Sequence, residues 1–329
     1  MAVPAEYPII DAHHHLWDEP PALGKKVERP YIIDDLAADV ADGHTIVATV
    51  YVECGSHYRK QGPEHLRPLG ETEWVLDQVR DQPLSGLCAG IVGYADLSLG
   101  DQVAEVLEAH IALSEGRIRG VRQSAARDDD PVFDRLPHKP AAGLLANPAF
   151  HRGFQRLQSL GLVFDAMLFH PQLNELVELA RAFPETAIVI DHVGGFIGIG
   201  EYSKRRDAEI AAWRADLETL ADCPNLVMKI GGMGMFLGGS PLLHRETDPS
   251  VKEIAADWAP FIHYAIDCFG PGRCMFESNY PVDGATCSYR RLWDVFKELA
   301  KDYSETEQQA LFSGVASRVY SIPVCGSQN

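Results

Sequence analysis

The chain has 329 residues, of which 46% are hydrophobic and 23% charged, and its formal net charge is −18. This composition is typical of a soluble globular protein with a sizeable core and excludes a disordered chain. The negative charge repels phosphate backbones and anionic lipids, so we expect a small-molecule substrate and no nucleic-acid or membrane partner. The sequence leaves the oligomeric state open, a homo-oligomer included.

Two further features narrow the class of protein. The first residues contain no basic segment followed by an apolar one, and no later apolar run approaches the roughly 18 residues of a membrane span. We therefore expect a cytoplasmic protein. The seven cysteines are scattered and form no Cys-x-x-Cys pair, which indicates reduced thiols rather than a disulfide framework or a thiolate metal site.

Eight short β-rich apolar runs alternate along the chain with segments of helical periodicity. The predicted strands cover residues 9–12, 46–52, 87–94, 117–122, 162–165, 187–190, 226–230 and 273–276. The predicted helices cover residues 101–113, 148–160, 172–183, 207–223, 250–269 and 289–301. This alternation predicts βαβ units and a parallel sheet. Eight repeats favour an α/β fold of the (β/α)8 barrel type over a doubly wound open sheet, as a single domain over residues 1–329.

The first predicted strand carries a His-x-His motif. Alternate residues of an extended strand point to the same side, so His13 and His15 should project together and His14 to the opposite face. Two imidazoles in this arrangement can chelate a divalent ion or polarise a carbonyl group. A solvated loop is the alternative interpretation of the motif on its own.

Reactive side chains also follow the other strands, at the end of a (β/α)8 barrel where the chemistry takes place. They are Glu53, Arg122, Asp165, His170, Asp191, His192, Lys229, Glu277, Asn279 and Asp283. Each of them alone has a structural explanation, because an acid can cap a loop and a lysine can extend its amine to solvent. Their regular placement together predicts an active site at the carboxyl ends of the strands.

Three loops are longer or richer in glycine than a simple connection requires. They cover residues 123–147, 194–200 and 231–239, and the last two combine apolar residues with several glycines. Such loops are typical of lids that exclude water from a partly hydrophobic substrate. Packing against neighbouring helices is the alternative.

The order of these motifs resembles the amidohydrolase superfamily, in particular the amidohydrolase-related branch (amidohydrolase 2), which contains sugar lactonases and 2-pyrone-4,6-dicarboxylate lactonase. The resemblance runs from Ile10 to Tyr320. It is carried by His13-x-His15, Arg119-Gly120-Val121-Arg122, Asp191-His192-x-Gly194 and Met275-Phe276-Glu277-Ser278-Asn279-Tyr280-Pro281-Val282. It implies a distorted (β/α)8 TIM barrel with His13, His15 and His192 in the site, and it places His170 near a further histidine of some relatives.

The chain departs from this family at strand eight. Family members usually carry an Asp in a Gly-Ser-Asp-Trp-Pro-like motif, where it acts as the base for water and often touches the metal, and this chain has Asn279 there. An amide cannot take a proton at neutral pH, so the base has moved or the chemistry differs. Glu277 is the first candidate for the displaced carboxylate because it shares a strand face with position 279, and Glu53 and Asp283 follow. We expect burial to raise the pKa of Glu277 unless neighbouring cations oppose the shift.

Two alternatives stay open for the cofactor. One is a single divalent metal, zinc or manganese, bound by His13, His15 and His192. The other is no metal at all, because Asn279 removes an anionic ligand and related lactonases work without one.

The predicted function is hydrolysis of a cyclic ester, a lactone with or without a carboxylate, in aromatic or sugar catabolism. A carboxylate or a metal-bound hydroxide delivers water to the carbonyl carbon. His13, His15 and His192 then bind or polarise the carbonyl oxygen and stabilise the developing negative charge.

Arginine residues are the candidates for recognising a carboxylate on the substrate. Arg122, together with Arg127, would form charge-assisted hydrogen bonds with it, and Glu53 and His170 are further candidates for substrate binding. A salt bridge from Arg122 to Glu53 or Asp165 is the structural alternative.

Three other functions compete with the lactonase. They are a metal-dependent decarboxylase of the same superfamily, a hydrolase of the C–C bond in a ring-cleavage product, and a catalytically impaired binding protein. The convergence of so many titratable groups speaks against the last. A lactonase releases one proton per turnover, whereas a decarboxylase releases carbon dioxide.

Overall fold

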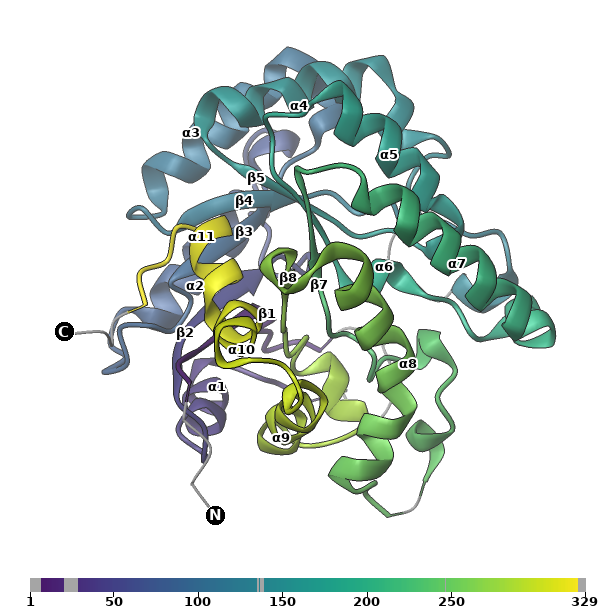
Figure 1. Cartoon of the computed structure of the whole chain (residues 1–329). Helices are drawn as coiled ribbons and strands as arrows, with labels where there is room; N and C mark the ends of the chain where they lie inside the picture. Colours follow the sequence, from purple (N-terminus) through teal and green to yellow (C-terminus); the bar gives the residue numbers. More distant parts are fainter. Residues whose placement is uncertain (1–6, 21–28, 135, 137–138, 246, 325–329) are drawn as a thin grey trace.

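The computed structural model describes residues 7–20, 29–134, 136, 139–245 and 247–324. Eight parallel strands form one sheet in chain order, with helices between them (Figure 1). The strands are β1 (Ile9–His14), β2 (Ile46–Val52), β3 (Gly90–Tyr94), β4 (Ile118–Arg122), β5 (Val163–Ala166), β6 (Ile188–Ile190), β7 (Leu226–Lys229) and β8 (Cys274–Met275). The predicted distorted (β/α)8 TIM barrel is confirmed.

The distortion lies at the seam where the last strand meets the first. In the described residues, β1 and the segment after β8 join through a single parallel bridge between His14 and Tyr280. The His15 amide donates to the Tyr280 carbonyl at 2.8 Å. The buried carboxylate of Asp11 reinforces the seam, because it accepts the amide and the hydroxyl of Ser278 at 2.9 and 2.7 Å. The seam therefore holds the His-x-His motif beside the segment that follows β8.

The predicted helices are present. The structure also contains helices that the sequence analysis did not predict. The described helices are α1 (Ile33–Val40), α2 (Leu69–Val79), α3 (Val103–Leu113), α4 (Pro148–Leu160), α5 (Leu173–Ala182), α6 (His192–Gly195), α7 (Arg206–Ala221), α8 (Val251–Phe269), α9 (Tyr289–Ala300), α10 (Glu305–Gln309) and α11 (Val315–Val319). The start of α8 was readable because Ser250 and Glu253 form a capping box. By contrast, α1 and α2 begin after Ile32 and Pro68, whose side chains make no cap hydrogen bond, so the usual start signal is missing.

β3 departs most from its predicted bounds, and it does so for a local reason. The apolar run from residue 87 predicts a strand to 94, but β3 begins at Gly90. Cys88 adopts a φ of 48°, outside the extended region. Its amide instead donates to the hydroxyl of Thr49 at 2.8 Å, which makes the first residues of the run a turn.

The side chains that point into the barrel form two layers, an apolar one and, towards the carboxyl ends of the strands, a charged one. One cluster collects side chains from alternate positions of several strands, among them Val50, Val92, Val163, Val189 and Val227. Two residues further along β5, β6 and β7, on the same face, lie Asp165, Asp191 and Lys229. Small branched residues thus fill the barrel beneath a layer of charged groups.

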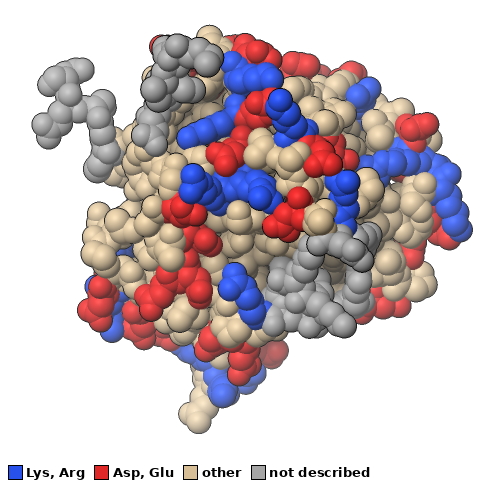
Figure 2. Space-filling view, turned by 90° about the horizontal axis from the view of Figure 1, so that it is seen from below, with Lys and Arg blue, Asp and Glu red and all other residues tan. Residues whose placement is uncertain are grey.

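The face of the molecule in Figure 2 has no broad basic region. On the face in Figure 2, Lys and Arg side chains are interspersed with Asp and Glu. In the described part of the chain, no helix has both the length and the apolar composition that crossing a bilayer requires.

Candidate active site

The three histidines predicted to share a site come together at the carboxyl ends of β1 and β6. The Nε2 atoms of His13 and His15 lie 3.1 Å apart, and the ring centroids of His13 and His192 lie 4.7 Å apart. All three side chains are buried. Their predicted clustering at one end of a parallel barrel is confirmed, and their catalytic roles stay predictions.

The geometry of β1 gives each histidine its direction. The register of β1 against β2 shifts just before His14, and such a bulge re-aims the side chains that follow it. His14 Nε2 lies 2.9 Å from the hydroxyl of Thr49, away from the other two histidines, as predicted. His15 Nδ1 lies 2.8 Å from the carbonyl oxygen of Val52. Because a carbonyl only accepts, His15 carries its proton on Nδ1 and keeps a lone pair on Nε2.

Glu277 joins the histidines into one unit. Its Oε2 lies 3.0 Å from His13 Nδ1, and its Oε1 lies 2.8 Å from His192 Nδ1 and accepts the His192 amide at 3.1 Å. Burial raises the pKa of this carboxyl, but the opposing charges and hydrogen bonds of His192 and His13 outweigh burial and bring the pKa down to about 2. The expected rise in the pKa of Glu277 therefore does not occur, because these histidines supply the opposing charge.

Two buried cations are already paired with acids. Arg122 donates from Nε to Glu53 at 2.7 Å and from Nη1 to Asp191 at 3.2 Å. Lys229 donates to Asp165 at 2.6 Å and lies 3.1 Å from Asp191. The structural alternative for Arg122, a salt bridge to Glu53, is thus present, whereas Asp165 pairs with Lys229. Roles for Arg122 and Glu53 in substrate binding stay predictions.

Asn279 faces another acid instead of the histidines. Its Nδ2 donates to Asp283 Oδ1 at 2.8 Å, and the Gly234 amide donates to Asp283 Oδ2 at 2.9 Å. Asn279 has a φ of 47°, a left-handed conformation that Asn tolerates better than most residues. Burial raises the pKa of Asp283 to about 7, and the Gly234 amide only partly offsets this rise.

His170 is engaged elsewhere. Its Nε2 lies 2.9 Å from Glu209, and its Nδ1 accepts the Ile197 amide at 3.1 Å. Burial lowers the pKa of its imidazole. Both ring nitrogens are therefore occupied by protein groups, and the substrate-binding role of His170 stays a prediction.

The glycines after β7 are explained by close approach to the site. A Cβ at Gly231 would overlap Glu277, and one at Gly232 would overlap the ring of His192. A Cβ at Gly234 would lie 2.9 Å from the Cβ of Asp283. Only glycine allows the backbone to pass this close to these side chains.

The three predicted lid loops pack on one another. Ala126 and Phe133 from the first, Ile197 from the second and Leu237 from the third belong to one apolar cluster. The Gly198 amide donates to the Leu237 carbonyl at 2.8 Å. Residues 135, 137 and 138 of the first loop lie outside the described residues. The loops form a common apolar layer, and their movement as a lid stays a prediction.

Three of these groups lie close enough together to hold a cation. One ligand atom from each of His13, His192 and Glu277 lies within 4.8 Å of the others. The sequence prediction named His15 in place of Glu277 as the third ligand, and that ligand set stays a prediction. Two buried oxygens lie beside His13: Glu277 Oε2 is 3.0 Å from His13 Nδ1, and Asp191 Oδ1 is 3.1 Å from Lys229 Nζ. Nitrogen and carboxylate donors of this kind suit zinc or manganese, so the residues fit the predicted metal.

Sequence reasoning missed Tyr320 as a member of the charged layer. From the end of α11, its hydroxyl donates to Asp165 at 2.9 Å. This contact joins residues 155 positions apart, and no local pattern signals it.

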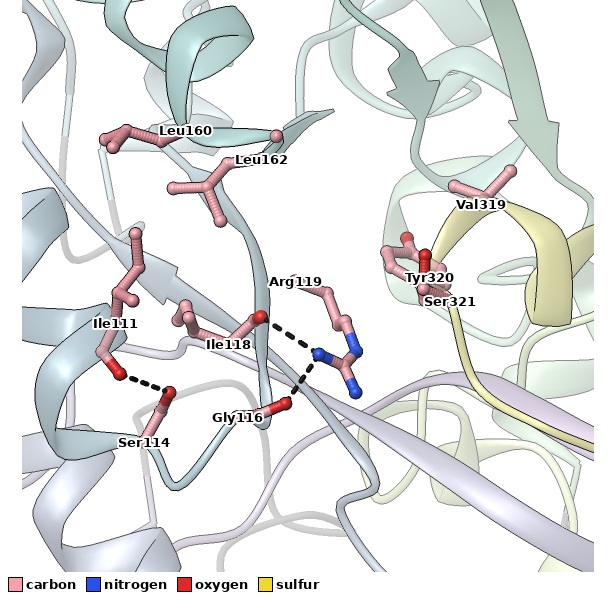
Figure 3. Close-up of a pocket in the computed structure, with 11 residues that line it drawn as sticks. Ile111, Ser114, Gly116, Ile118, Arg119, Leu160, Leu162, Val319, Tyr320 and Ser321 are labelled. Atoms are coloured by element: carbon pink, nitrogen blue, oxygen red, sulfur yellow. Dashed lines mark hydrogen bonds between the residues drawn. The ribbon is translucent and has the colours of Figure 1, made fainter.

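A separate cavity of about 280 Å³ lies at the opposite end of β4 and β5 (Figure 3). It is lined by Ile118, Leu160 and Leu162 together with Arg119, whose Nη1 donates to the carbonyl of Ile118. Arg119 is at the amino-terminal end of β4 and Arg122 at its carboxyl end. The cavity is therefore distinct from the histidine cluster.

Comparison with known sequences identifies a family and several relatives. The family model described as Amidohydrolase matches residues 10–322. An uncharacterized protein of Sinorhizobium fredii, y4mH, is 32% identical over 95% of this chain and 98% of its own length. An L-fucono-1,5-lactonase of Burkholderia multivorans is 26% identical over 95% of this chain and 96% of its own. An L-rhamnono-gamma-lactonase of Scheffersomyces stipitis is 22% identical over 84% of this chain and 86% of its own.

Solved structures give the same fold. A crystal structure of an amidohydrolase from Burkholderia multivorans with bound zinc has a TM-score of 0.73 at 25% identity, covering 96% of this chain and 99% of that one. A crystal structure from Pseudomonas putida that is described as a putative 2-pyrone-4,6-dicarboxylic acid hydrolase has a TM-score of 0.65 at 16% identity, covering 96% of this chain and 98% of that one. This second likeness bears on the fold alone.

Proposed function

Because this chain belongs to the amidohydrolase family, we propose that it hydrolyses the ester bond of a lactone. The observation that carries the proposal is the unit of His13, His15 and His192 joined by Glu277 at the catalytic end of the barrel. The names of the related lactonases support lactones of sugar acids as the substrate class. We propose sugar catabolism as the context.

His192 can bind and polarise the lactone carbonyl when it is protonated. Burial lowers the pKa of His192, but the charge and the hydrogen bond of Glu277 at Nδ1 outweigh burial and raise this pKa, so Nε2 can donate to the carbonyl oxygen. His15 donates from Nδ1 to Val52, and the lone pair on its Nε2 can accept from a substrate hydroxyl. Donors and positive charge held in place before the reaction stabilise the negative charge that develops on the carbonyl oxygen. A carboxylate of the site takes the proton of the attacking water.

We propose that His13, His192 and Glu277 hold a divalent ion, zinc or manganese, beside His15. The nitrogen and carboxylate donors that these three residues bring together support this, as does the zinc in the related Burkholderia structure. When bound, the ion would supply Lewis acidity toward the carbonyl oxygen and lower the pKa of water.

The charges of the site favour a neutral, hydroxylated lactone over a dicarboxylate. Among the described residues, two permanent cations face the acids of the site, Arg122 and Lys229, and both are paired. These acids are Glu53, Asp165, Asp191, Glu277 and Asp283. A carboxylate on the substrate would have to displace one of these pairs. Hydroxyl groups can instead bond to acids that remain paired.

Hydrolysis of L-fucono-1,5-lactone and L-rhamnono-γ-lactone, followed with a pH indicator, tests the proposal. We expect one proton per turnover from the wild-type protein and a loss of at least about 100-fold in kcat for His192→Asn. His65→Asn serves as the control, because His65 lies at the surface against Glu105 and should retain activity. Proton release from neither lactone, together with carbon dioxide release from aromatic carboxylates, would refute lactone hydrolysis.

A further inference from the structure

One acid of the site differs from the other four in its partners. Ion pairs join Glu53 to Arg122 and join Asp165 and Asp191 to Lys229, and Glu277 contacts His13 and His192. Asp283 has only neutral donors among the described residues, namely Asn279 Nδ2 at 2.8 Å and the Gly234 amide at 2.9 Å. Each of its oxygens keeps a second lone pair.

On the basis of the lactone hydrolysis proposed above, we propose that Asp283 accepts the proton of the attacking water and that Asn279 positions Asp283. The water oxygen bonds to the carbonyl carbon while one of its protons passes to the Asp283 carboxylate. The bond between the carbonyl carbon and the ring oxygen then breaks, and the proton on Asp283 passes to the departing alkoxide. The products are the open hydroxy acid and the ionised Asp283 with which the cycle began.

The ion pairs explain why Asp283 suits this role better than Glu277. Protonation of Glu277 would remove the charge that holds two buried histidines, and a buried charge without its partner is strongly unfavourable. Protonation of Asp283 breaks no ion pair. Its pKa of about 7, raised by burial, also lies near the working pH, whereas the pKa of Glu277 is about 2. A general base works best when its pKa is near the working pH.

The titratable groups around Asp283 are His192, Glu277 and Cys287. Positive charge on His192 favours the ionised form of Asp283, and negative charge on Glu277 opposes it. Burial, followed by the charge of Asp283, raises the pKa of the Cys287 thiol to about 12, so this group stays neutral. His192 and Glu277 therefore offset each other, and burial remains the main influence on Asp283.

The same contact explains the amide at position 279. An aspartate there would place a second carboxylate beside Asp283 at the 2.8 Å separation that Asn279 now has, and two carboxylates this close cannot both ionise. Asn279 preserves the hydrogen bond and removes one charge. The carboxylate that relatives carry at strand eight is thus moved four residues along the chain, to Asp283.

Three variants test the assignment on L-fucono-1,5-lactone. In Asp283→Asn the amide oxygen can still accept from Gly234, and Asn279 can turn its own oxygen to accept from the new NH2 group. The substitution removes the proton acceptor, so we expect kcat to fall at least about 100-fold with little change in KM. The double variant N279D/D283N returns a carboxylate to position 279, and we expect it to recover at least about tenfold over Asp283→Asn. Thr286→Val is the structural control, because the Thr286 hydroxyl donates to the carbonyl oxygen of the same Gly234 at 3.1 Å. We expect this substitution to leave kcat within about threefold.

A spectroscopic readout separates this assignment from the proposed function. Infrared difference spectra between wild type and Asp283→Asn should contain a protonated carboxyl band that disappears as the pH rises through about 7. Wild-type protein inactive on every sugar lactone refutes the proposed function alone. Near-native kcat in Asp283→Asn, an equal loss in Thr286→Val, or no carboxyl titrating near neutral pH overturns the role of Asp283.

Discussion

Glu277 and Asp283 follow the same strand six residues apart and are equally buried, yet their surroundings give them opposite properties. Glu277 contacts two histidines and has its pKa lowered to about 2, whereas Asp283 contacts two amides and has its pKa raised to about 7. Burial acts in the same direction on both. The charge of the hydrogen-bond partners therefore decides whether a buried acid of this barrel stays ionised or takes up a proton near neutrality.

The largest expected effect comes from removing the charge of Glu277. In Glu277→Gln the amide has a single oxygen, so it cannot accept hydrogen bonds from both histidines as the carboxylate does. The buried His192 also loses its counter-charge. We expect kcat on a sugar lactone to fall by about 10²- to 10⁴-fold. Zinc content, measured on the purified variant, should fall with it.

Circular dichroism and the free energy of unfolding serve as controls for Glu277→Gln. Near-native kcat and zinc content would mean that the histidines need no carboxylate partner, which would remove the contrast between the two acids.

A smaller effect is expected from the backbone that passes over the histidines. Gly232 has a φ of 67°, and its Cβ would overlap the His192 ring. Gly232→Ala should lower the free energy of unfolding by about 1–3 kcal/mol and reduce kcat, because His192 must move away from Glu277.

Gly238→Ala is the matched control in a neighbouring segment. Nothing lies within 4 Å of a Cβ at Gly238, so its free energy of unfolding should change by less than about 0.5 kcal/mol. Equal effects of the two substitutions would show that the site tolerates a side chain over His192.

A further expected effect is a pair of opposite pH dependences of stability. The folded pKa of Asp283 is raised from 3.8 to about 7, so its contribution to stability is present below pH 3.8 and is lost as the pH rises through about 7. The folded pKa of Glu277 is lowered from 4.5 to about 2, so its contribution is present above pH 4.5 and is lost as the pH falls through about 2.

Urea unfolding of wild type and Asp283→Asn between about pH 4 and pH 8 measures the first dependence. The variant should lack the loss of stability that wild type undergoes as the pH rises toward 7. Parallel curves for the two proteins would place the titration on another group.

Much of the fold and of the site was predictable, because apolar runs mark the strands and alternate residues of a strand point to the same side. The alternation of apolar runs predicted eight strands, and the His-x-His spacing predicted which of three consecutive histidines point inward. The partners of these groups were not predictable, because Glu277 contacts histidines from β1 and from the segment after β6, and Tyr320 reaches Asp165 from the far end of the chain. The sign of the Glu277 pKa shift depends on those partners and could not be read from burial alone.

A crystal structure grown with zinc and L-fuconate, the ring-opened acid, tests the central claim most directly. Anomalous scattering at the zinc edge should give one peak within bonding distance of His13, His192 and Glu277, with the carboxylate of the acid beside His15 and within reach of Asp283. An acid bound only in the cavity beside Arg119, or zinc bound away from the three residues, would contradict the assignment of the active site.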